Sequence, residues 1–156
     1  MEDSCEAAQA IAQELLDITG QAIRVGDFAT FSSCFTIPQL VETFEGQRIL
    51  KTPGELQIAF EAVRAHHSRS GITEMVRHCV TAAFKDHETI DTVHETRLVS
   101  GSVMAQAPYP AFSVLKFNGQ KWQVSKCAYA IPDSERHNKA LMGLANPLPK
   151  DQFKSA

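Results

Sequence analysis

The stretch that decides the fold runs from residue 111 to 131 and reads AFSVLKF, then Asn118-Gly119, then QKWQVSKCAYAI. Asn-Gly is a strong signal for a two-residue hairpin turn, because both residues accept the positive φ of a type I′ turn. A turn at these two positions also fixes the register of the flanking strands, so that Leu115 lies opposite Trp122. The end of the chain is therefore predicted to be an antiparallel hairpin.

The same register predicts which side chains of the hairpin face the core. The apolar side carries Leu115, Phe117, Trp122 and Val124. Simple alternation along each strand places Ser113 and Lys126 on this inward side and Tyr129 on the other. The prediction is a half-buried sheet with a few polar groups aimed at the interior.

Composition limits the classes of function. The 156 residues carry a formal net charge of −3 without a run of Lys or Arg, which argues against nucleic acid and anionic membranes as partners. No stretch approaches the roughly 20 apolar residues that cross a bilayer, and the acidic N-terminus is unlike a signal or transit peptide. The four cysteines lack zinc-site spacing, so we expect no metal, reduced thiols and a cytoplasmic location.

Helical patterns occupy the N-terminal third of the chain. Apolar residues spaced by three and four form one stripe, at Ala8, Ile11, Leu15, Ile18, Ala22 and Val25. Gly26 is placed to end this helix, and Asp27 can cap a second, short helix over 28–35. Phe31 would belong to the buried face of that short helix.

A small hairpin and a third helix follow. LVETF, a turn at Glu45-Gly46 and RIL predict two short strands, and Glu42 and Phe44 share one side of the first. Thr52 is a good N-cap for the next helix, because Pro53 follows at the first helical position and Glu55 can complete a capping box. Phe60 would lie on the buried face of that helix.

Two long strands are predicted over 73–84 and 88–100. With a three-residue loop between them, His78 and His94 oppose each other and point inward, while Arg77 pairs with Glu95 on the outer face. A four-residue loop would instead place His78 opposite Glu95, and the sequence leaves this alternative open.

Residues 101–110 are expected to form a loop that ends at Tyr109-Pro110. After Pro132, the segment SERHNKALMGLAN predicts one more helix, and the proline-containing tail has no regular pattern. We therefore expect one α+β domain over 1–132, followed by a C-terminal helix and tail over 133–156.

This order of elements resembles the nuclear transport factor 2-like superfamily, and within it the SnoaL-like and ketosteroid-isomerase-like branch. The resemblance lies in AIRVGDFATFSSCF, VETFEGQRILKTPGEL and FNGQKWQVSKCAYAI, and it spans about residues 7 to 131. It implies a cone, in which a curved antiparallel sheet wraps around N-terminal helices and leaves a pocket at its open end. It also implies a homodimer formed through the outer face of the sheet.

The resemblance does not carry over the catalytic residues of the ketosteroid isomerases. Those enzymes use an aspartate base and a tyrosine/aspartic acid pair that donates to an oxyanion. The shared landmarks place Thr43 at the base position, Thr19 at the tyrosine position and Ser113 at the second aspartate. A threonine is not a base near neutral pH, although a shift of one residue would bring Glu42 to that position.

Four ionisable residues remain candidates for chemistry: His78, His94, Lys126 and Glu42. An inward pair of histidines can act as general acid and base or bind an anion, and it can equally be a hydrogen-bonded part of the core. A desolvated lysine can act as a base or nucleophile, but a lysine near a strand end often extends to water. Glu42 is either a proton-shuttling acid or an ordinary solvent-facing residue.

The functional hypothesis is a protein that binds a small organic ligand in an apolar cavity. If it is an enzyme, we expect an isomerase, dehydratase or cyclase that works by proton transfer and needs no cofactor. The alternative is a non-catalytic ligand carrier or a dimerising protein-interaction module. The expected ligand-binding residues are Ser113, Trp122, Phe31, Phe44, Phe60 and Tyr109.

Overall fold

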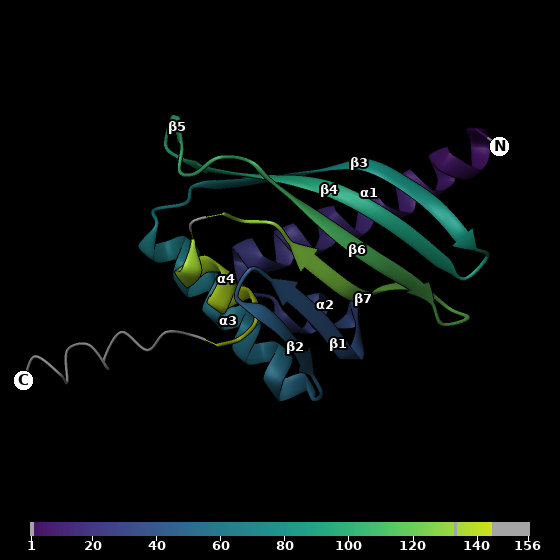
Figure 1. Ribbon diagram of the computed structural model, residues 1–156, viewed down its shortest axis with the longest axis horizontal. Coiled ribbons are helices and arrows are strands. Elements are labelled where there is room, and N and C mark those ends of the chain that lie inside the picture. The colour runs from purple at the N-terminus through teal and green to yellow at the C-terminus, as the bar shows by residue number, and fades with distance from the viewer. Residues whose placement is uncertain (1, 133, 145–156) are drawn as a thin grey trace, which may run out of the picture.

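The computed structural model describes residues 2–132 and 134–144 and contains a curved sheet with helices behind one face (Figure 1). The sheet has seven strands in the order β2-β1-β7-β6-β4-β3, and β5 pairs with β4. The strands are β1 (Phe35–Thr43), β2 (Gly46–Leu50), β3 (Glu74–Asp86), β4 (Thr89–Ser100), β5 (Val103–Met104), β6 (Tyr109–Phe117) and β7 (Trp122–Tyr129). The helices are α1 (Glu2–Val25), α2 (Phe28–Ser33), α3 (Pro53–Arg69) and α4 (Glu135–Leu141).

The predicted α+β cone, with a curved sheet against N-terminal helices, is confirmed in its architecture. The sheet is mixed rather than wholly antiparallel, because β1 runs parallel to β7. None of the described helices combines the length and apolar character needed to cross a membrane. The predicted tail beyond Leu144 lies outside the described residues.

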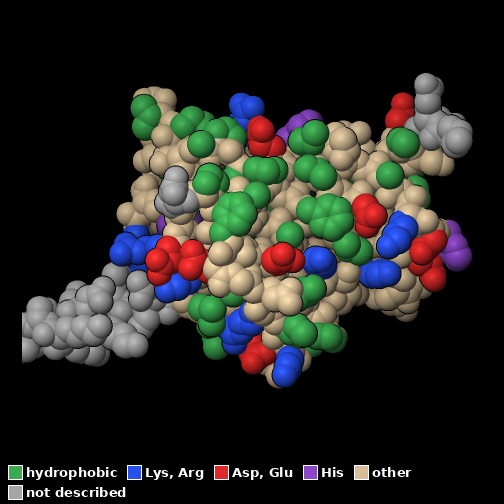
Figure 2. Space-filling view, viewed as in Figure 1, with side chains coloured by type: hydrophobic (Ala, Val, Ile, Leu, Met, Phe, Trp, Pro, Cys, Tyr) green, Lys and Arg blue, Asp and Glu red, His purple; other side chains and the backbone are tan. Residues whose placement is uncertain are grey.

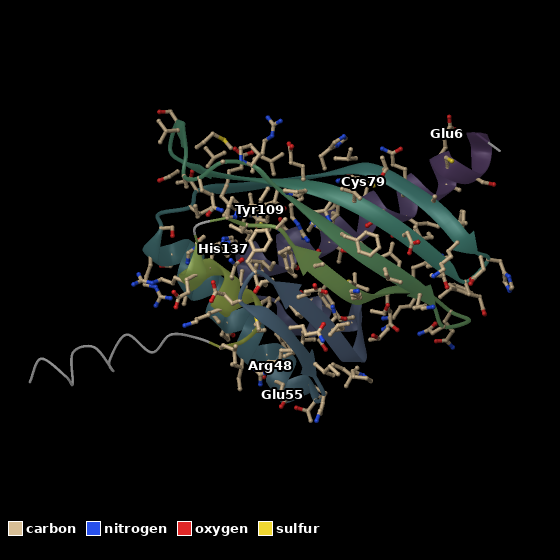
Figure 3. The ribbon with its side chains drawn as sticks, viewed as in Figure 1. Glu6, Arg48, Glu55, Cys79, Tyr109 and His137 are labelled. Atoms are coloured by element: carbon tan, nitrogen blue, oxygen red, sulfur yellow. The ribbon has the colours of Figure 1, made fainter. Side chains whose placement is uncertain are left out.

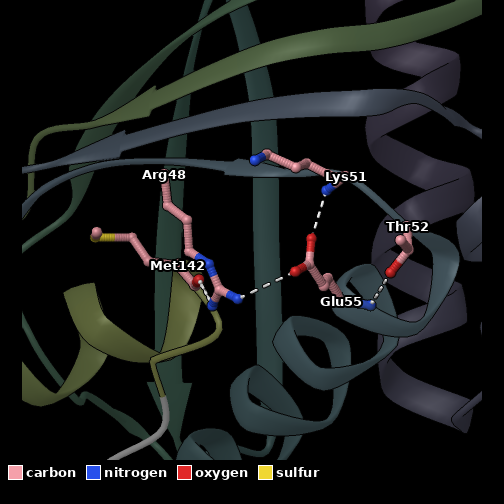
Figure 4. Close-up of polar contacts among 5 residues, drawn as sticks. All are labelled: Arg48, Lys51, Thr52, Glu55 and Met142. Carbon is pink, nitrogen blue, oxygen red and sulfur yellow. Dashed lines mark hydrogen bonds and ion pairs between the residues drawn. The ribbon is translucent and has the colours of Figure 1, made fainter.

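The predicted helix signals hold in the N-terminal half. Gly26 follows α1 with φ of +80°, and the Asp27 carboxylate caps α2 by accepting the Thr30 N–H at 3.1 Å. Thr52 Oγ1 accepts the Glu55 N–H at 3.1 Å at the start of α3. The Glu55 carboxylate accepts the N–H of Lys51 at 2.6 Å rather than that of Thr52 (Figure 4). The caps therefore fix where α2 and α3 begin.

Helix α1 packs along β3, the edge strand of the sheet. The Gln13 amide bridges two backbone groups of β3, since its Oε1 accepts the Cys79 N–H at 2.8 Å and its Nε2 donates to the Arg77 carbonyl at 3.0 Å. Gln9 Nε2 donates to the Cys79 carbonyl at 3.1 Å. An edge strand exposes unpaired backbone groups, and here α1 supplies part of the missing partners.

The β6–β7 turn differs from the predicted two-residue turn. Asn118 N donates to the carbonyl of Lys121 at 3.1 Å, and Phe117 pairs with Trp122, so four residues form the loop. The Asn118 side-chain oxygen accepts the backbone N–H groups of Gln120 at 2.8 Å and Lys121 at 3.0 Å. These side-chain bonds stabilise a wider loop, so the predicted register of the hairpin is wrong.

A bulge in β7 changes which side chains face inward. Leu115 pairs with Val124 but Val114 pairs with Lys126, which leaves Ser125 as an extra residue. An inserted residue reverses the alternation beyond it. Lys126 therefore points to the outer face and Tyr129 to the interior, the reverse of the prediction for both residues.

The β3–β4 pair adopts the register that the sequence left as an alternative. His78 lies opposite Glu95, and Cys79 lies opposite His94. The turn itself is shorter than either prediction, and bulges at Val80 and Lys85 absorb the difference. His94 is buried and His78 is exposed, so the predicted facing pair of histidines is wrong.

The described core fills the space between the sheet and the helices. Phe31 and Phe60 lie at its centre with ring centroids 4.7 Å apart, and Phe60 is 1% exposed. Helix α4 packs against α3 and β1, so that residues after the last strand also contribute to the core.

We predict that Phe60→Ala lowers the free energy of unfolding by about 3–5 kcal/mol, because it removes a fully buried ring and leaves empty space in the core. Urea denaturation monitored by Trp122 fluorescence measures this loss. The matched control is Ile58→Ala on the same helix, where the side chain is 54% exposed and the change should stay within about 0.5 kcal/mol. Equal losses for the two variants would contradict the described packing of α3.

Candidate functional site

A small cavity of about 60 Å³ lies between the sheet and the helices. Aromatic and aliphatic side chains form most of its wall, and Gln39, Arg77 and Tyr129 supply its polar groups. The full lining is Ile23, Phe31, Phe35, Gln39, Val41, Leu50, Leu56, Ala59, Phe60, Val63, Arg77, Tyr129 and Leu141. An apolar cavity with a few convergent polar groups is the usual form of a small-molecule site.

Arg77 brings a positive charge into this interior. It lies on the inward side of β3, and its Nη1 donates to Thr19 Oγ1 at 2.7 Å and to the Leu16 carbonyl at 3.3 Å. Thr19 in turn donates to the Leu15 carbonyl at 2.7 Å, which leaves its oxygen lone pairs for the arginine. Helix α1 therefore holds the guanidinium group through backbone and hydroxyl oxygens.

Neutral polar groups surround the Arg77 charge. Burial raises the pKa of Tyr129 well above its usual range and the pKa of Tyr109 to about 12, so both hydroxyls keep their protons. Burial and the charge of Arg77 lower the pKa of His94 to about 3. At neutral pH Arg77 is thus the charged group among these side chains.

Two buried polar atoms near the interior lack a hydrogen-bond partner among the described residues. Gln39 is 1% exposed, yet its Oε1 accepts no hydrogen bond. His94 is 2% exposed, and its Nε2 is unpaired as well. Leaving such an atom unpaired costs roughly 1–3 kcal/mol, so each is a candidate position for a ligand or a water molecule.

Helix α4 places His137 between α3 and β6. The His137 ring stacks on His66 with centroids 4.4 Å apart. It also meets Tyr109 edge-on, with centroids 5.5 Å apart; Figure 3 labels these two residues. Both ring nitrogens of His137 are buried without a described partner. His66, His67 and His137 form a histidine cluster. Burial lowers the pKa of His137 to about 3, that of His67 to about 4 and that of His66 below its usual value, so the cluster is neutral at pH 7.

The end of α4 is fixed by contacts from β1 and β2. Arg48 Nη1 donates to the Met142 carbonyl at 2.9 Å, and Arg48 Nη2 lies 3.8 Å from Glu55 Oε2 (Figure 4). Thr43 Oγ1 contacts Met142 Sδ at 3.0 Å. Because Leu141 lines the cavity, these contacts also position one of its walls.

The structure separates the four predicted catalytic residues. His94 is inside, whereas His78, Glu42 and Lys126 are on the outer face of the sheet, so the predicted inward orientation of His78 and Lys126 is wrong. Lys126 Nζ lies 4.0 Å from Glu42 Oε1. The Lys126 side chain is 35% exposed and the Glu42 side chain is 48% exposed. For Glu42, this is the solvent-facing alternative.

The predicted ligand-binding residues are also divided. Phe31 and Phe60 line the cavity. Ser113 and Tyr109 are buried, and Ser113 Oγ contacts Cys127 Sγ at 3.0 Å. Trp122 borders a separate groove between α1 and α2, and Phe44 is 66% exposed, so its expected place in a cavity is wrong.

Sequence reasoning missed Arg77, Gln39 and His137. Arg77 was assigned to outer-face ion pairs because the register chosen for β3 was one residue out. Gln39 and His137 gave no signal, since a single polar residue in a strand or helix does not reveal its burial. Only the alternative register of the β3–β4 pair, in which His78 lies opposite Glu95, predicts an inward Arg77.

The outer face of the sheet carries an apolar groove of about 290 Å³. Phe44 and Phe112 border it and are 66% and 37% exposed. Figure 2 shows apolar side chains gathered on this face, with charged groups around them. Among the described residues, no group of three or more His, Cys, Asp or Glu side chains is placed to hold a metal ion.

This architecture is the cystatin-like fold of the nuclear transport factor 2-like proteins, as the sequence predicted. No protein-family model and no curated protein matches the chain. Solved structures do match, and a cystatin-like-fold protein from Nostoc punctiforme has a TM-score of 0.60 at 14% identity, covering 96% of this chain and 84% of its own. The likeness shows a shared fold.

Two further structures are similar in the same way. A nuclear transport factor 2-like protein from Novosphingobium aromaticivorans has a TM-score of 0.62 at 13% identity, covering 86% of this chain and 88% of its own. A nuclear transport factor 2-like protein of unknown function from Pseudomonas putida has a TM-score of 0.61 at 16% identity, covering 81% of this chain and 88% of its own. The SnoaL-like branch stays a prediction.

We predict that acidification destabilises the protein through its buried histidines. Their folded-state pKa values, about 3 for His94 and His137 and about 4 for His67, lie below the unfolded value of about 6.5. Between the folded and unfolded pKa values, the unfolded chain binds more protons than the folded chain. The free energy of unfolding therefore rises with pH over this interval. The contribution of these neutral histidines to the free energy of unfolding is complete above about pH 6.5. It is lost toward pH 3, at up to about 1.4 kcal/mol per pH unit for each histidine.

Urea unfolding at pH 7, 6, 5 and 4 measures this slope. His137→Phe keeps an aromatic ring against His66 and should flatten the slope by about one histidine's share. The matched control is His87→Gln in the exposed β3–β4 turn, which should leave the slope as it is. A His137→Phe variant with the unchanged slope would contradict a buried neutral imidazole at this position.

Proposed function

We propose that this protein binds a small organic molecule in the interior cavity. The observation that carries the proposal is that Arg77 and Gln39, whose Oε1 is unpaired, line the same cavity as phenylalanine and aliphatic side chains. Stability alone would favour apolar residues at such positions, because a buried polar atom without a partner costs free energy. A polar ligand group would supply the missing partner.

The same placements favour ligand binding over proton-transfer catalysis by the residues that the sequence singled out. Glu42, His78 and Lys126 lie outside the cavity, and His94 is held neutral by burial. A general acid and base must both lie within hydrogen-bond reach of the reacting atom. A catalytic role would therefore need other groups, of which the Tyr129 hydroxyl is the one on the cavity wall.

We further propose that the protein forms a homodimer through the outer face of its sheet. Phe44 and Phe112 border an apolar groove there, and the ion pair between Glu42 and Lys126 lies beside it. A contiguous exposed apolar patch with a polar rim is typical of a protein interface.

The four cysteines are all free, in keeping with a reducing compartment such as the cytoplasm.

Gln39→Leu tests the cavity as a ligand site. The change removes an unpaired buried oxygen at similar volume, so we expect the ligand-free protein to gain about 1 kcal/mol of unfolding free energy. Native mass spectrometry of the purified protein should show a co-purified ligand on the natural chain and a lower occupancy on the variant. Gln47→Leu on the exposed strand β2 is the matched control, with neither effect expected.

The cavity proposal fails if Gln39→Leu lowers stability by more than about 1 kcal/mol and leaves ligand occupancy unchanged. That result would make Gln39 a structural residue.

Phe112→Lys tests the dimer. A lysine on the border of the groove would have to be desolvated in the interface, so we expect a shift from dimer to monomer in light scattering coupled to size-exclusion chromatography. Val103→Lys, on a strand pair far from the groove and 63% exposed, is the control and should leave the mass unchanged. A monomeric natural chain at about 100 μM would refute the interface at ordinary interface affinities.

A further inference from the structure

The charge of Arg77 has no counter-ion among the described residues. Five ion pairs are present in the described structure, and none of them includes Arg77. Its two hydrogen bonds both start from Nη1 and end on neutral oxygens of Thr19 and Leu16. The guanidinium group of this half-buried residue therefore still has its Nε and Nη2 donors available for a further partner.

Arg77 is a half-buried cation without an anion beside it among the described residues. Burying a charge is costly unless the charge is paired and hydrogen-bonded, and removing a charge partner from such a site is strongly destabilising. The chain nevertheless places an arginine here, on the same strand as exposed Val76 and Val80. An anion at the free donors would restore the balance of charge.

The remaining wall of the cavity limits which anion fits. One guanidinium balances one negative charge, and the other polar groups there, Gln39 and Tyr129, are neutral. A phosphate dianion would leave excess negative charge among Phe31, Phe35 and Phe60. A carboxylate matches the planar fork of arginine through two parallel hydrogen bonds, and an apolar body would contact the phenylalanine rings.

A groove at the surface adjoins the cavity at one side chain. A surface groove of about 310 Å³ shares Ile23 with the cavity, and its charged lining residues are Arg24, Arg64 and Glu74. Arg64 is anchored there by donating its Nε to the Ile23 carbonyl at 2.9 Å. Two arginines against one carboxylate leave this groove with net positive charge, which raises the local concentration of anions. Ile23 lines both the groove and the cavity.

We infer that the cavity takes a compact organic monocarboxylate, with the carboxylate on the Arg77 guanidinium and the apolar body against Phe31, Phe35 and Phe60. This inference rests on the proposed function and adds the chemical class of the ligand. A cavity of about 60 Å³ is small for a ligand site. Acids with few carbon atoms fit first, and larger ones require Leu141 of α4 to move.

Matched pairs of probes test the inference, namely isobutyrate against isobutyramide and benzoate against benzamide. Each pair keeps the shape and changes the charge. Dissociation constants from isothermal titration at pH 7 and low salt should be about tenfold or more lower for the carboxylates, because charge-assisted bonds to arginine are the stronger ones. Arg77→Met, which keeps the apolar stem, should remove this preference.

Two further variants keep the test decisive. Arg77→Lys retains the charge if Arg77→Met does not fold, and it should weaken carboxylate binding several-fold by removing the planar fork. Arg97→Met removes an exposed arginine from the outer face of the neighbouring strand and should change nothing.

Equal binding of acids and amides, or a preference that survives at Arg77→Met, would overturn the carboxylate inference and leave a neutral ligand for the cavity. Failure of all four probes to bind at up to about 10 mM would overturn the proposed ligand site as well. A preference for the acids that depends on Arg77 and not on Arg97 would support the inference.

Discussion

The packing of α1 against the edge strand β3 is the contact on which the interior depends. Gln9 and Gln13 satisfy backbone groups of Cys79 and Arg77, and Thr19 accepts a hydrogen bond from the Arg77 side chain. These bonds hold the strand in the register that turns Arg77 inward and His78 outward. The polar interior is thus a consequence of how one helix covers one edge of the sheet.

The outer and inner faces of the sheet have different chemistry, and two bulges produce that difference. The bulge at Ser125 moves Tyr129 to the cavity and Lys126 to the surface, and the bulge at Val80 shifts the alternation of β3. Without them, strict alternation would place a lysine inside and a tyrosine outside. Bulges often occur where a strand must direct particular side chains toward a site.

The sequence was sufficient for the elements and for the fold, because caps, periodicity and turn residues are local signals. Thr52, Asp27 and Gly26 each act as predicted. The candidate site was harder to predict, since the inward or outward position of a side chain changes with a shift of one residue. Neither the bulge at Ser125 nor the use of the Asn118 side chain in a wider turn leaves a pattern that a single sequence reveals.

The parallel pairing of β1 with β7 joins segments that are far apart along the chain, since Leu40 lies beside Lys126 and Glu42 beside Ala128. During synthesis on the ribosome, β1 must therefore wait for nearly all of the remaining chain before it gains its second neighbour. Contacts of such large sequence separation slow folding, because the intervening loop loses entropy before the contact forms. Until then β1 is a strand edge open to other chains, and a nascent copy is vulnerable to aggregation.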